Sequence, residues 1–294
     1  MIKVFAVVVT YNRKQLLEEC IKSLENQSRH VDNIVIINNN SSDGTTEFLS
    51  ALNRKELLVF NLDENIGGAA GFSLGVKKAY NSGADYIWIM DDDTIPDTGA
   101  LEALLEKKDV LENKFGFLCS NVRWKDGSAT NIPKVSSRWS SKSMNNLIQV
   151  DTATFVSVFI SRSVVKKVGI PTAKLFIWGD DTEYTTRISV NYPSYFVIDS
   201  TVLHKSQNNL TTTNIINDDN IDRISRYFYM YRNLVYIARK YNGGKAVLKT
   251  LLSANIFAFK ALFLSKDHKF KRFYTVFKGL LYGLFFSPKV EFPR

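Results

Sequence analysis

The stretch Tyr86-Ile87-Trp88-Ile89-Met90-Asp91-Asp92-Asp93 leads from five apolar residues directly into three adjacent carboxylates. Its β-branched and aromatic side chains predict a buried strand. Three neighbouring negative charges repel one another, so they are stable only in water or around a cation. The stretch therefore predicts either a divalent-metal site at a strand end or a solvated loop that caps the next helix.

The residues before this strand alternate between strand and helix patterns. Strands are predicted at Lys3–Thr10, Asn33–Asn38, Leu57–Asn61 and Asp85–Met90, and helices at Lys14–Gln27, Thr45–Leu52 and Gly68–Ser82. This order predicts an α/β fold, with a mainly parallel sheet flanked by helices on both faces. Ligands of such sheets bind at the carboxyl ends of the strands.

The pattern after residue 115 is less regular. Strands are predicted at Phe117–Val122, Val150–Ser161 and Ser194–Asp199, helices at Ser163–Val168 and Asp181–Asn191, a polar loop at Ser136–Asn146 and a flexible connection at Thr211–Asn220. We therefore expect one α/β domain over residues 1–215, divided near residue 115, and a basic, aromatic helical region over 216–294.

Positive charge is concentrated at the end of the chain. The net charge is +9, and residues 222–294 hold 15 of the 38 Lys and Arg but only three of the 29 Asp and Glu. This asymmetry predicts a body that carries out chemistry and a tail that contacts an anionic membrane surface or nucleic acid. The apolar runs of the tail look shorter than the roughly 18 residues that cross a bilayer, so we expect surface helices.

The sequence also bears on the compartment. The start of the chain runs straight into a strand without a cleavage site, so no signal peptide is expected. Cys20 and Cys119 lie in apolar contexts and predict buried thiols in a reducing environment.

Polar residues follow every predicted strand of the first half. They are Thr10 and Arg13, then Asn39, then Asn65 with Gly67 and Gly68, then the three aspartates. These turns converge on one edge of a parallel sheet, where Arg13 can pair with a phosphate and the glycines allow a ligand close to the backbone. The same glycines also fit a tight helix start. The chain has no Walker lysine and no strict G-x-G-x-x-G, which disfavours a P-loop ATPase or a dinucleotide enzyme.

A second acidic group occurs at Trp178-Gly179-Asp180-Asp181-Thr182-Glu183-Tyr184. In a cleft, neighbouring carboxylates would raise the pKa of Asp181 and make it a competent base. The alternative is that Asp180 or Asp181 caps a helix whose first turn contains Glu183. His204 follows a predicted strand and is either a ligand or a structural histidine.

Taken in order, four motifs resemble family 2 of the inverting glycosyltransferases, which have the GT-A fold. They are Val7–Arg13, Asn39–Gly44, Asp91–Asp93 and Asp180–Tyr184, and the resemblance covers about residues 1–205. It implies transfer of a hexosyl group from a nucleotide sugar to an acceptor hydroxyl. The stretch Asn65–Phe72 is similar to the galactofuranosyltransferase branch, which favours UDP-galactofuranose over dTDP-rhamnose as the donor.

The resemblance also implies roles for single residues. Residues up to about 115 would bind the nucleotide sugar and residues 116–215 the acceptor. Asn38 departs from the family, many members of which have aspartate there. The implied ligands of Mn²⁺ or Mg²⁺ are Asp91, Asp93 and His204. The implied contacts to the donor are Thr10, Arg13, Asn39, Asn65, Gly68, Asp91 and Asp92. The implied general base is Asp181, with Asp180 beside it, and the implied acceptor contacts are Trp178 and Glu183.

The implied setting is polysaccharide biosynthesis for the cell envelope. We expect a lipid-linked glycan acceptor and a cytoplasmic enzyme held on the inner face of the membrane by its basic helices, with no nucleic-acid partner. These helices could instead pack on the body or on a second copy, which leaves a homo-oligomer open. The alternatives are a rhamnosyltransferase, a nucleotidyltransferase, and a non-enzymatic protein that binds nucleic acid or an anionic surface.

Overall fold

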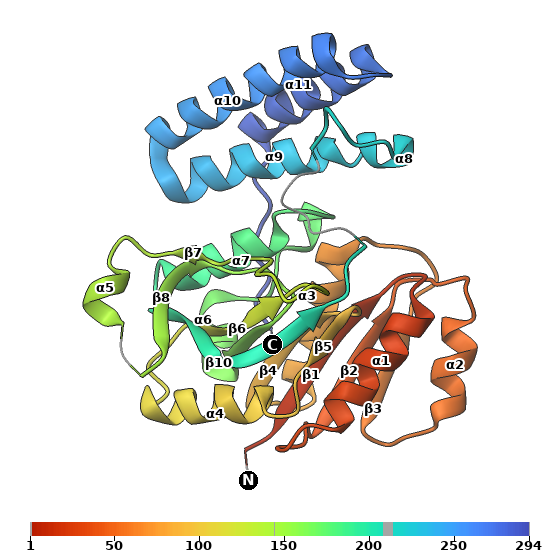
Figure 1. Cartoon of the computed structure of the whole chain (residues 1–294), viewed down its shortest axis with the longest axis vertical. Coiled ribbons are helices and arrows are strands. Elements are labelled where there is room, and N and C mark those ends of the chain that lie inside the picture. The colour runs from red at the N-terminus through yellow and green to blue at the C-terminus, as the bar shows by residue number, and fades with distance from the viewer. Residues whose placement is uncertain (1, 144, 208–213, 294) are drawn as a thin grey trace.

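The structure is a computed structural model that describes residues 2–143, 145–207 and 214–293 (Figure 1). Within these residues a ten-stranded sheet forms the centre of the body, by which we mean residues 2–207. The strand order is β3-β2-β1-β4-β9-β6-β10-β8-β7, and β5 pairs with β10 beside this path. Helices cover both faces of the sheet, as the alternating pattern predicts.

The first half of the sheet is parallel. Its strands are β1 (Val4–Thr10), β2 (Asn33–Asn38), β3 (Leu57–Asn61) and β4 (Tyr86–Asp91), and its helices are α1 (Lys14–Glu25), α2 (Thr45–Leu52) and α3 (Gly68–Asn81). β1 lies between β2 and β4, and β2 pairs with β3. These bounds agree with the predicted ones to within two residues at each end. The carboxyl ends of β1 and β4 therefore lie side by side.

The second half mixes parallel and antiparallel pairs. Its elements are β5 (Thr94–Pro96), α4 (Ala100–Val110), β6 (Phe117–Arg123), β7 (Lys134–Val135), α5 (Trp139–Lys142), β8 (Leu147–Thr152), β9 (Val158–Ser161), α6 (Arg162–Val168), the 3₁₀ helix η1 (Ala173–Leu175), α7 (Asp180–Ser189) and β10 (Ser194–His204). β9 lies antiparallel between β4 and β6.

Three expectations for this half are wrong. The single strand expected at 150–161 is two strands, because the chain turns after β8 and returns as β9 in another part of the sheet. The polar loop expected at 136–146 contains α5, and α4 and β5 were not expected at all. β10 extends to His204 because a bulge after Val197 lets it continue its pairing with β6 and then pair with β5.

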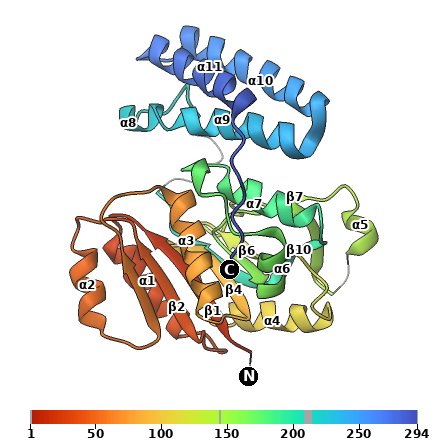
Figure 2. The same cartoon turned by 180° about the vertical axis from the view of Figure 1, so that it is seen from behind.

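The core has two layers, one on each face of the sheet. On one face Leu17 of α1 and Leu101 of α4 belong to the same cluster as Val8, and on the other Val76 of α3 and Tyr184 of α7 belong to the same cluster as Val7. Figure 2 shows α3 in front of the parallel strands on that second face. Gly75 allows this close approach, because a Cβ there would lie 2.4 Å from Cγ1 of Val7.

The C-terminal helices form a separate layer, residues 215–285, which we call the helical layer (Figure 1). It consists of α8 (Ile221–Ile224), α9 (Tyr227–Ile237), a π-helical segment η2 (Ala238–Asn242), α10 (Gly243–Leu264) and α11 (Lys269–Phe285). Its small core includes Tyr231, Val235, Ala258 and Leu280. The chain then returns to the body, where Ile170 N donates to the carbonyl of Glu291 at 2.9 Å.

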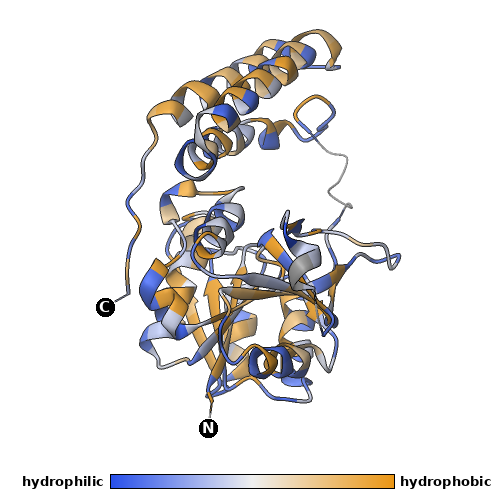
Figure 3. Ribbon diagram, turned by 90° about the vertical axis from the view of Figure 1, so that its left-hand side faces the viewer, coloured by the Kyte–Doolittle hydropathy of each residue, from blue (hydrophilic) through white to orange (hydrophobic). Residues whose placement is uncertain are grey.

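The outer side of the helical layer is apolar. Figure 3 shows α10 and α11 as largely hydrophobic ribbons held away from the body. Within the described residues, one helical stretch, Ile221–Leu264, is long and apolar enough to cross a membrane, and only 17% of its most apolar window is buried. The expectation that the tail has only short apolar runs is therefore wrong. Residues 211–213 of the flexible connection expected at 211–220 lie outside the described residues.

Candidate active site

Strand pairing brings the acidic stretch and the histidine together. β4 ends at Asp91, and the short strand β5 that follows pairs antiparallel with the end of β10, so that Thr94 lies opposite His204. One ligand atom from each of Asp91, Asp93 and His204 lies within 4.8 Å of the others. The three predicted metal ligands thus share one site at the carboxyl ends of β4 and β10.

The orientation of His204 fits a metal ion. Its Nδ1 lies 2.9 Å from Oδ1 of Asn131, an acceptor, so the proton of the neutral ring lies on Nδ1. Its Nε2 then presents a lone pair to Oδ1 of Asp93, 3.1 Å away, and that oxygen is buried without another partner. Two acceptors at this distance need a cation or a proton between them. The spacing is that of two neighbouring ligands, each about 2.1 Å from one metal ion.

The type of metal follows from the donor atoms. Carboxylate oxygens suit Mg²⁺ and Mn²⁺, and an imidazole nitrogen makes Mn²⁺ the better match.

Asn131 was missed by the sequence analysis, because it lies in a loop after β6 and belongs to no strand end or motif. Its φ of 46° is the one local sign that its side chain is held in a special position.

Thr10 and Arg13 lie against the same carboxylates. Oγ1 of Thr10 donates to Oδ2 of Asp92 at 2.7 Å, and the guanidinium of Arg13 donates to Asp92 at 3.2 Å and to Asp93 at 2.7 Å. The side chain of Arg13 is 46% exposed. It neutralises the buried acids from the solvent side and is within reach of a ligand that approaches them.

The charges of this cluster are strongly coupled. Burial, with the charges of Asp93 and Asp92, raises the pKa of Asp91 to about 7, and burial raises the pKa of Asp92 to about 6 against the effect of Arg13. Burial acts to raise the pKa of Asp93, but its contact with His204 and the charge of Arg13 lower that pKa overall. Asp91 and Asp92 therefore favour a proton or a cation near them, and Asp93 stays ionised, as a metal site requires.

The predicted donor contacts shape a neighbouring turn. The side chain of Asn39 accepts from Ile66 N at 2.9 Å, and that of Asn65 accepts from Gly67 N at 2.9 Å. A Cβ added at Gly68 would meet nothing within 4 Å, so space is open there. Asn65 is exposed and Asn39 buried, so only the first can turn toward a ligand without leaving the core.

Asp180 and Asp181 begin α7, as predicted. Gly179 before them has a φ of 87°, a conformation that glycine adopts without strain. The pKa of Asp180 is raised well above its usual value by burial and by the charges of Asp181 and Asp91. The pKa of Asp181 is raised by burial, although its side chain accepts from Thr182 N at 2.5 Å. Ala69 N donates to the carbonyl of Phe176, four residues before Asp180, and this bond ties the start of α7 to the glycine turn at the same edge of the sheet.

The acceptor contact predicted for Glu183 is wrong. Its carboxylate is fully buried and accepts from Thr172 at 3.1 Å, from Arg187 at 3.1 Å and from Tyr241 at 2.5 Å. These hydrogen bonds tie α7 to η2, and they leave the Glu183 carboxylate facing other side chains of the protein rather than a substrate. Trp178 is half-buried against Tyr227, with ring centroids 5.0 Å apart, and keeps one part exposed.

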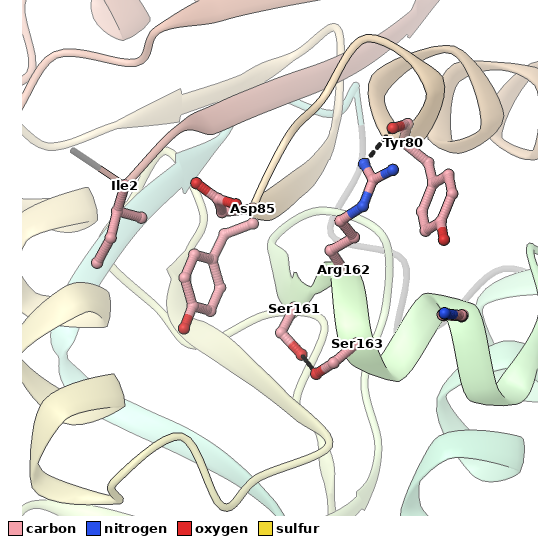
Figure 4. Close-up of a pocket in the computed structure, with 8 residues that line it drawn as sticks. Ile2, Tyr80, Asp85, Ser161, Arg162 and Ser163 are labelled. Atoms are coloured by element: carbon pink, nitrogen blue, oxygen red, sulfur yellow. Dashed lines mark hydrogen bonds between the residues drawn. The ribbon is translucent and has the colours of Figure 1, made fainter.

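A cavity of about 830 Å³ lies elsewhere in the body (Figure 4). It is lined by Ile2, Asp85 and Arg162, which lie near the amino ends of β1 and β4, at the edge opposite the acidic cluster. Arg162 is already engaged, because it donates to the carbonyl oxygens of Tyr80 and Ala84. This cavity takes no part in the candidate site.

Comparison with known proteins identifies the family. The sequence pattern described as Glycosyl transferase family 2 matches residues 5–169. The chain belongs to this family. This glycosyltransferase is 29% identical over 199 residues to galactofuranosyltransferase GlfT1 of Mycolicibacterium smegmatis, a match that covers 63% of the chain and 65% of that protein. It is 28% identical over 214 residues to GlfT1 of Mycobacterium tuberculosis, over 68% of the chain and 69% of that protein. The chain thus spans just under two thirds of the first relative.

Two groups of crystal structures share the fold. The structure of GalNAc-T7 with UDP, GalNAc and Mn²⁺ matches 93% of the chain and 54% of its own, with a TM-score of 0.66 at 15% identity. The structure of S. aureus TarS residues 1–349 with UDP-GlcNAc matches 95% of the chain and 82% of its own, with a TM-score of 0.63 at 13% identity. The predicted GT-A fold of the glycosyltransferase is confirmed.

Proposed function

We propose that the protein transfers a sugar from a nucleoside diphosphate to an acceptor hydroxyl, with inversion at the anomeric carbon and with a divalent cation. The observation that carries this proposal is the grouping of Asp91, Asp93 and His204 at the strand ends, with their ligand atoms within 4.8 Å. A cation held there would neutralise the diphosphate and make it a better leaving group.

The remaining steps belong to side chains of the chain itself. The acceptor oxygen attacks the anomeric carbon from the face opposite the diphosphate, the bond from that carbon to the diphosphate oxygen breaks, and Asp181 takes the hydroxyl proton. Burial raises the pKa of Asp181, which strengthens it as a base. Arg13, which is half exposed beside Asp93, would donate to the diphosphate, and the open space at Gly68 would leave room for the ribose.

UDP-galactofuranose is the donor we favour. The support is the similarity to two mycobacterial galactofuranosyltransferases and the Asn65–Phe72 motif, and UDP is the nucleotide in the matched structure of GalNAc-T7. The alternative donor is dTDP-rhamnose. Calorimetric titration with each nucleotide sugar in Mn²⁺, followed by mass spectrometry of transfer products, tests the choice. Selective binding of dTDP-rhamnose would overturn the donor assignment, and binding of no nucleotide sugar would overturn the function.

We further propose that the helical layer rests on the inner face of the cell membrane, where a lipid-linked glycan would serve as acceptor. The support is the outer side of α10 and α11, whose exposed large apolar side chains are Leu248, Leu252, Ile256, Phe257, Phe259, Phe263, Leu264, Phe270, Tyr274, Phe277, Leu281, Tyr282 and Phe285. Lysines are interleaved among them, including Lys249, Lys260, Lys269, Lys271 and Lys278. This combination suits an anionic lipid surface, whereas a second copy would bring like charges together.

Vesicle flotation tests the membrane proposal. We expect binding to vesicles with anionic lipid, weaker binding at high salt, and loss of binding when Phe263→Ser and Phe270→Ser are combined, because these side chains are 71% and 80% exposed. Ile132→Ser is the matched control, since Ile132 is 68% exposed but lies on the body. Flotation of the double variant like the wild type would contradict this proposal. So would a wild-type protein that forms a dimer through these helices and does not bind vesicles.

A further inference from the structure

The loop before the proposed base is strained. Residues 175–179, which we call the 175–179 loop, join η1 to α7 and end one residue before Asp180. Phe176 has φ 67° and ψ −63°, and Ile177 N donates to the carbonyl of Leu175 at 2.9 Å, which is the rare form of the γ-turn. Trp178 also has a positive φ, 59°. Bulky side chains avoid these conformations, so the surrounding structure must hold the loop.

Two neighbouring residues of α9 hold it. Asn233 is fully buried, and its amide group donates to the carbonyls of Leu175 at 3.1 Å, Ile177 at 3.3 Å and Trp178 at 2.6 Å. Arg232 donates to the carbonyls of Lys174 and Leu175, both at 3.0 Å. The loop carbonyls, turned inward by the strained backbone, thus find their donors on the helical layer.

The pair is itself held rigidly. Arg232 donates through Nε and Nη2 to Oδ1 of Asn233, at 3.0 and 2.9 Å, which fixes the amide with its NH₂ group toward the loop. The guanidinium carbon lies 3.9 Å from the ring centre of Phe286, at the start of the returning chain. Asn233 cannot rotate without breaking bonds on both of its sides.

The same loop also reaches the donor side of the site. Ala69 N donates to the carbonyl of Phe176 at 3.0 Å, and a Cβ added at Gly67 would lie 2.6 Å from that oxygen. The ring of Phe176 stacks on Tyr229 of α9, with centroids 4.6 Å apart. One short loop therefore contacts the glycine turn, the helical layer and the start of α7.

We propose that Arg232 and Asn233 are positioning residues for sugar transfer. They keep the 175–179 loop in the conformation that sets Asp180 and Asp181 beside the acidic cluster and Trp178 beside the acceptor. The helical layer is then required for the chemistry as well as for attachment to a surface. This inference rests on the proposed function only for its kinetic consequence, because the hold on the loop can be measured without substrate.

The test uses Asn233→Ala and the isosteric Asn233→Asp in the full chain. Hydrogen exchange read out by mass spectrometry should become faster at residues 175–179, because the carbonyls of Ile177 and Trp178 lose their side-chain donor and that of Leu175 keeps only Arg232. Transfer should fall about tenfold to a hundredfold, through kcat and the acceptor KM, while calorimetric affinity for UDP with Mn²⁺ stays unchanged. Arg232→Lys keeps the positive charge but loses the planar guanidinium that bonds Asn233 and the loop at once. It should speed exchange and slow transfer in the same way, but to a smaller extent.

Two variants serve as controls. Asn255→Ala removes an amide that donates to Leu251 within α10, and Arg239→Lys alters an arginine that donates to Leu284 and Phe286 within the same region. Neither should change exchange at 175–179 or transfer. Unchanged exchange in both Asn233 variants refutes the inference, whether or not the wild type transfers sugar. Faster exchange with full transfer refutes the positioning role, and equal loss of UDP affinity and transfer shows a general structural role instead.

Discussion

The body and the helical layer use apolar side chains in opposite ways. In the body they fill two layers around the sheet, and the buried Asp93 and His204 lie with Asp91 at one edge. In the described part of the chain, 16 of the 24 exposed large apolar side chains lie beyond residue 214. The difference teaches that one region holds charge in a defined place, whereas the other leaves much of its apolar surface uncovered. Each variant below should disturb one region and spare the other.

The largest effect is expected for Asp181→Asn. Removal of the base should lower kcat by about 10²–10⁴, while UDP affinity and vesicle binding remain as in the wild type. Steady-state kinetics, calorimetry and flotation on the same preparation measure all three. Turnover near the wild-type rate would remove Asp181 from the role of base, and a simultaneous loss of vesicle binding would end the proposed separation of the two regions.

Asn131→Ala should weaken the metal site without touching a ligand. Its side chain orients His204, and loss of such a partner lowers metal affinity by about 10-fold to 100-fold. Calorimetric titration with Mn²⁺ measures the change, and UDP affinity without metal should be unaffected. Asn146→Ala is the control, since that asparagine bonds Asp199 on the exposed surface. Equal Mn²⁺ affinity in the two variants would separate His204 from the metal.

Two glycines compare packing within the helical layer. A Cβ at Gly283 of α11 would lie 2.6 Å from Cβ of Val235, so Gly283→Ala should destabilise the layer by about 1–3 kcal/mol. A Cβ at Gly244 of α10 meets nothing within 4 Å, so Gly244→Ala should stabilise it by about 0.5–1 kcal/mol. Hydrogen exchange of the α9 amides, measured at increasing denaturant concentration, gives the change in the free energy of unfolding of the layer for both variants. The same sign for both variants would disprove the close packing of α9 on α11.

The smallest effect is a shift in the pH profile. Burial raises the pKa of Asp181 above the usual carboxyl value of about 3.9. The base form is present above the raised pKa and is lost as the pH falls through it, so the acid limb of kcat/KM should lie above pH 4. A limb at or below pH 4 would mean that the base is not a buried carboxyl.

The sequence predicts the regions of the body unequally. Before Asp91 each element has a local pattern, either a short continuous apolar strand or a one-faced helix, and so Asn33–Asn38 and Thr45–Leu52 match the structure. Residues 150–161 look like one strand because apolar residues recur in the partly buried β8, in the turn after it and in the fully buried β9. Their separation depends on partners far along the chain, which no local pattern encodes.

The site divides in the same way. The grouping of Asp91, Asp93 and His204 was predicted through the family resemblance and agrees with the structure. Glu183 has the spacing of a site residue, yet it is buried, because Arg187 one turn later and Tyr241 of η2 both bond to it. Asn131, Arg232 and Asn233 carry no signal in the sequence. Asn131 itself lies in a loop, and Arg232 and Asn233 bond to loop atoms, and only the folded chain defines the course of these loops.

The return of the chain to the body after α11 has one more consequence. The helical layer follows β10 in the chain, and the segment after it contacts the body again at Glu291. The Glu291 carboxylate pairs with Lys77 at 2.6 Å, and its backbone carbonyl accepts from Ile170 N. A region fixed at both of its ends cannot swing out like an arm on a single hinge. If its outer side rests on lipid, the catalytic edge of the sheet stays at a constant height above the bilayer, which limits the length of glycan that can reach it.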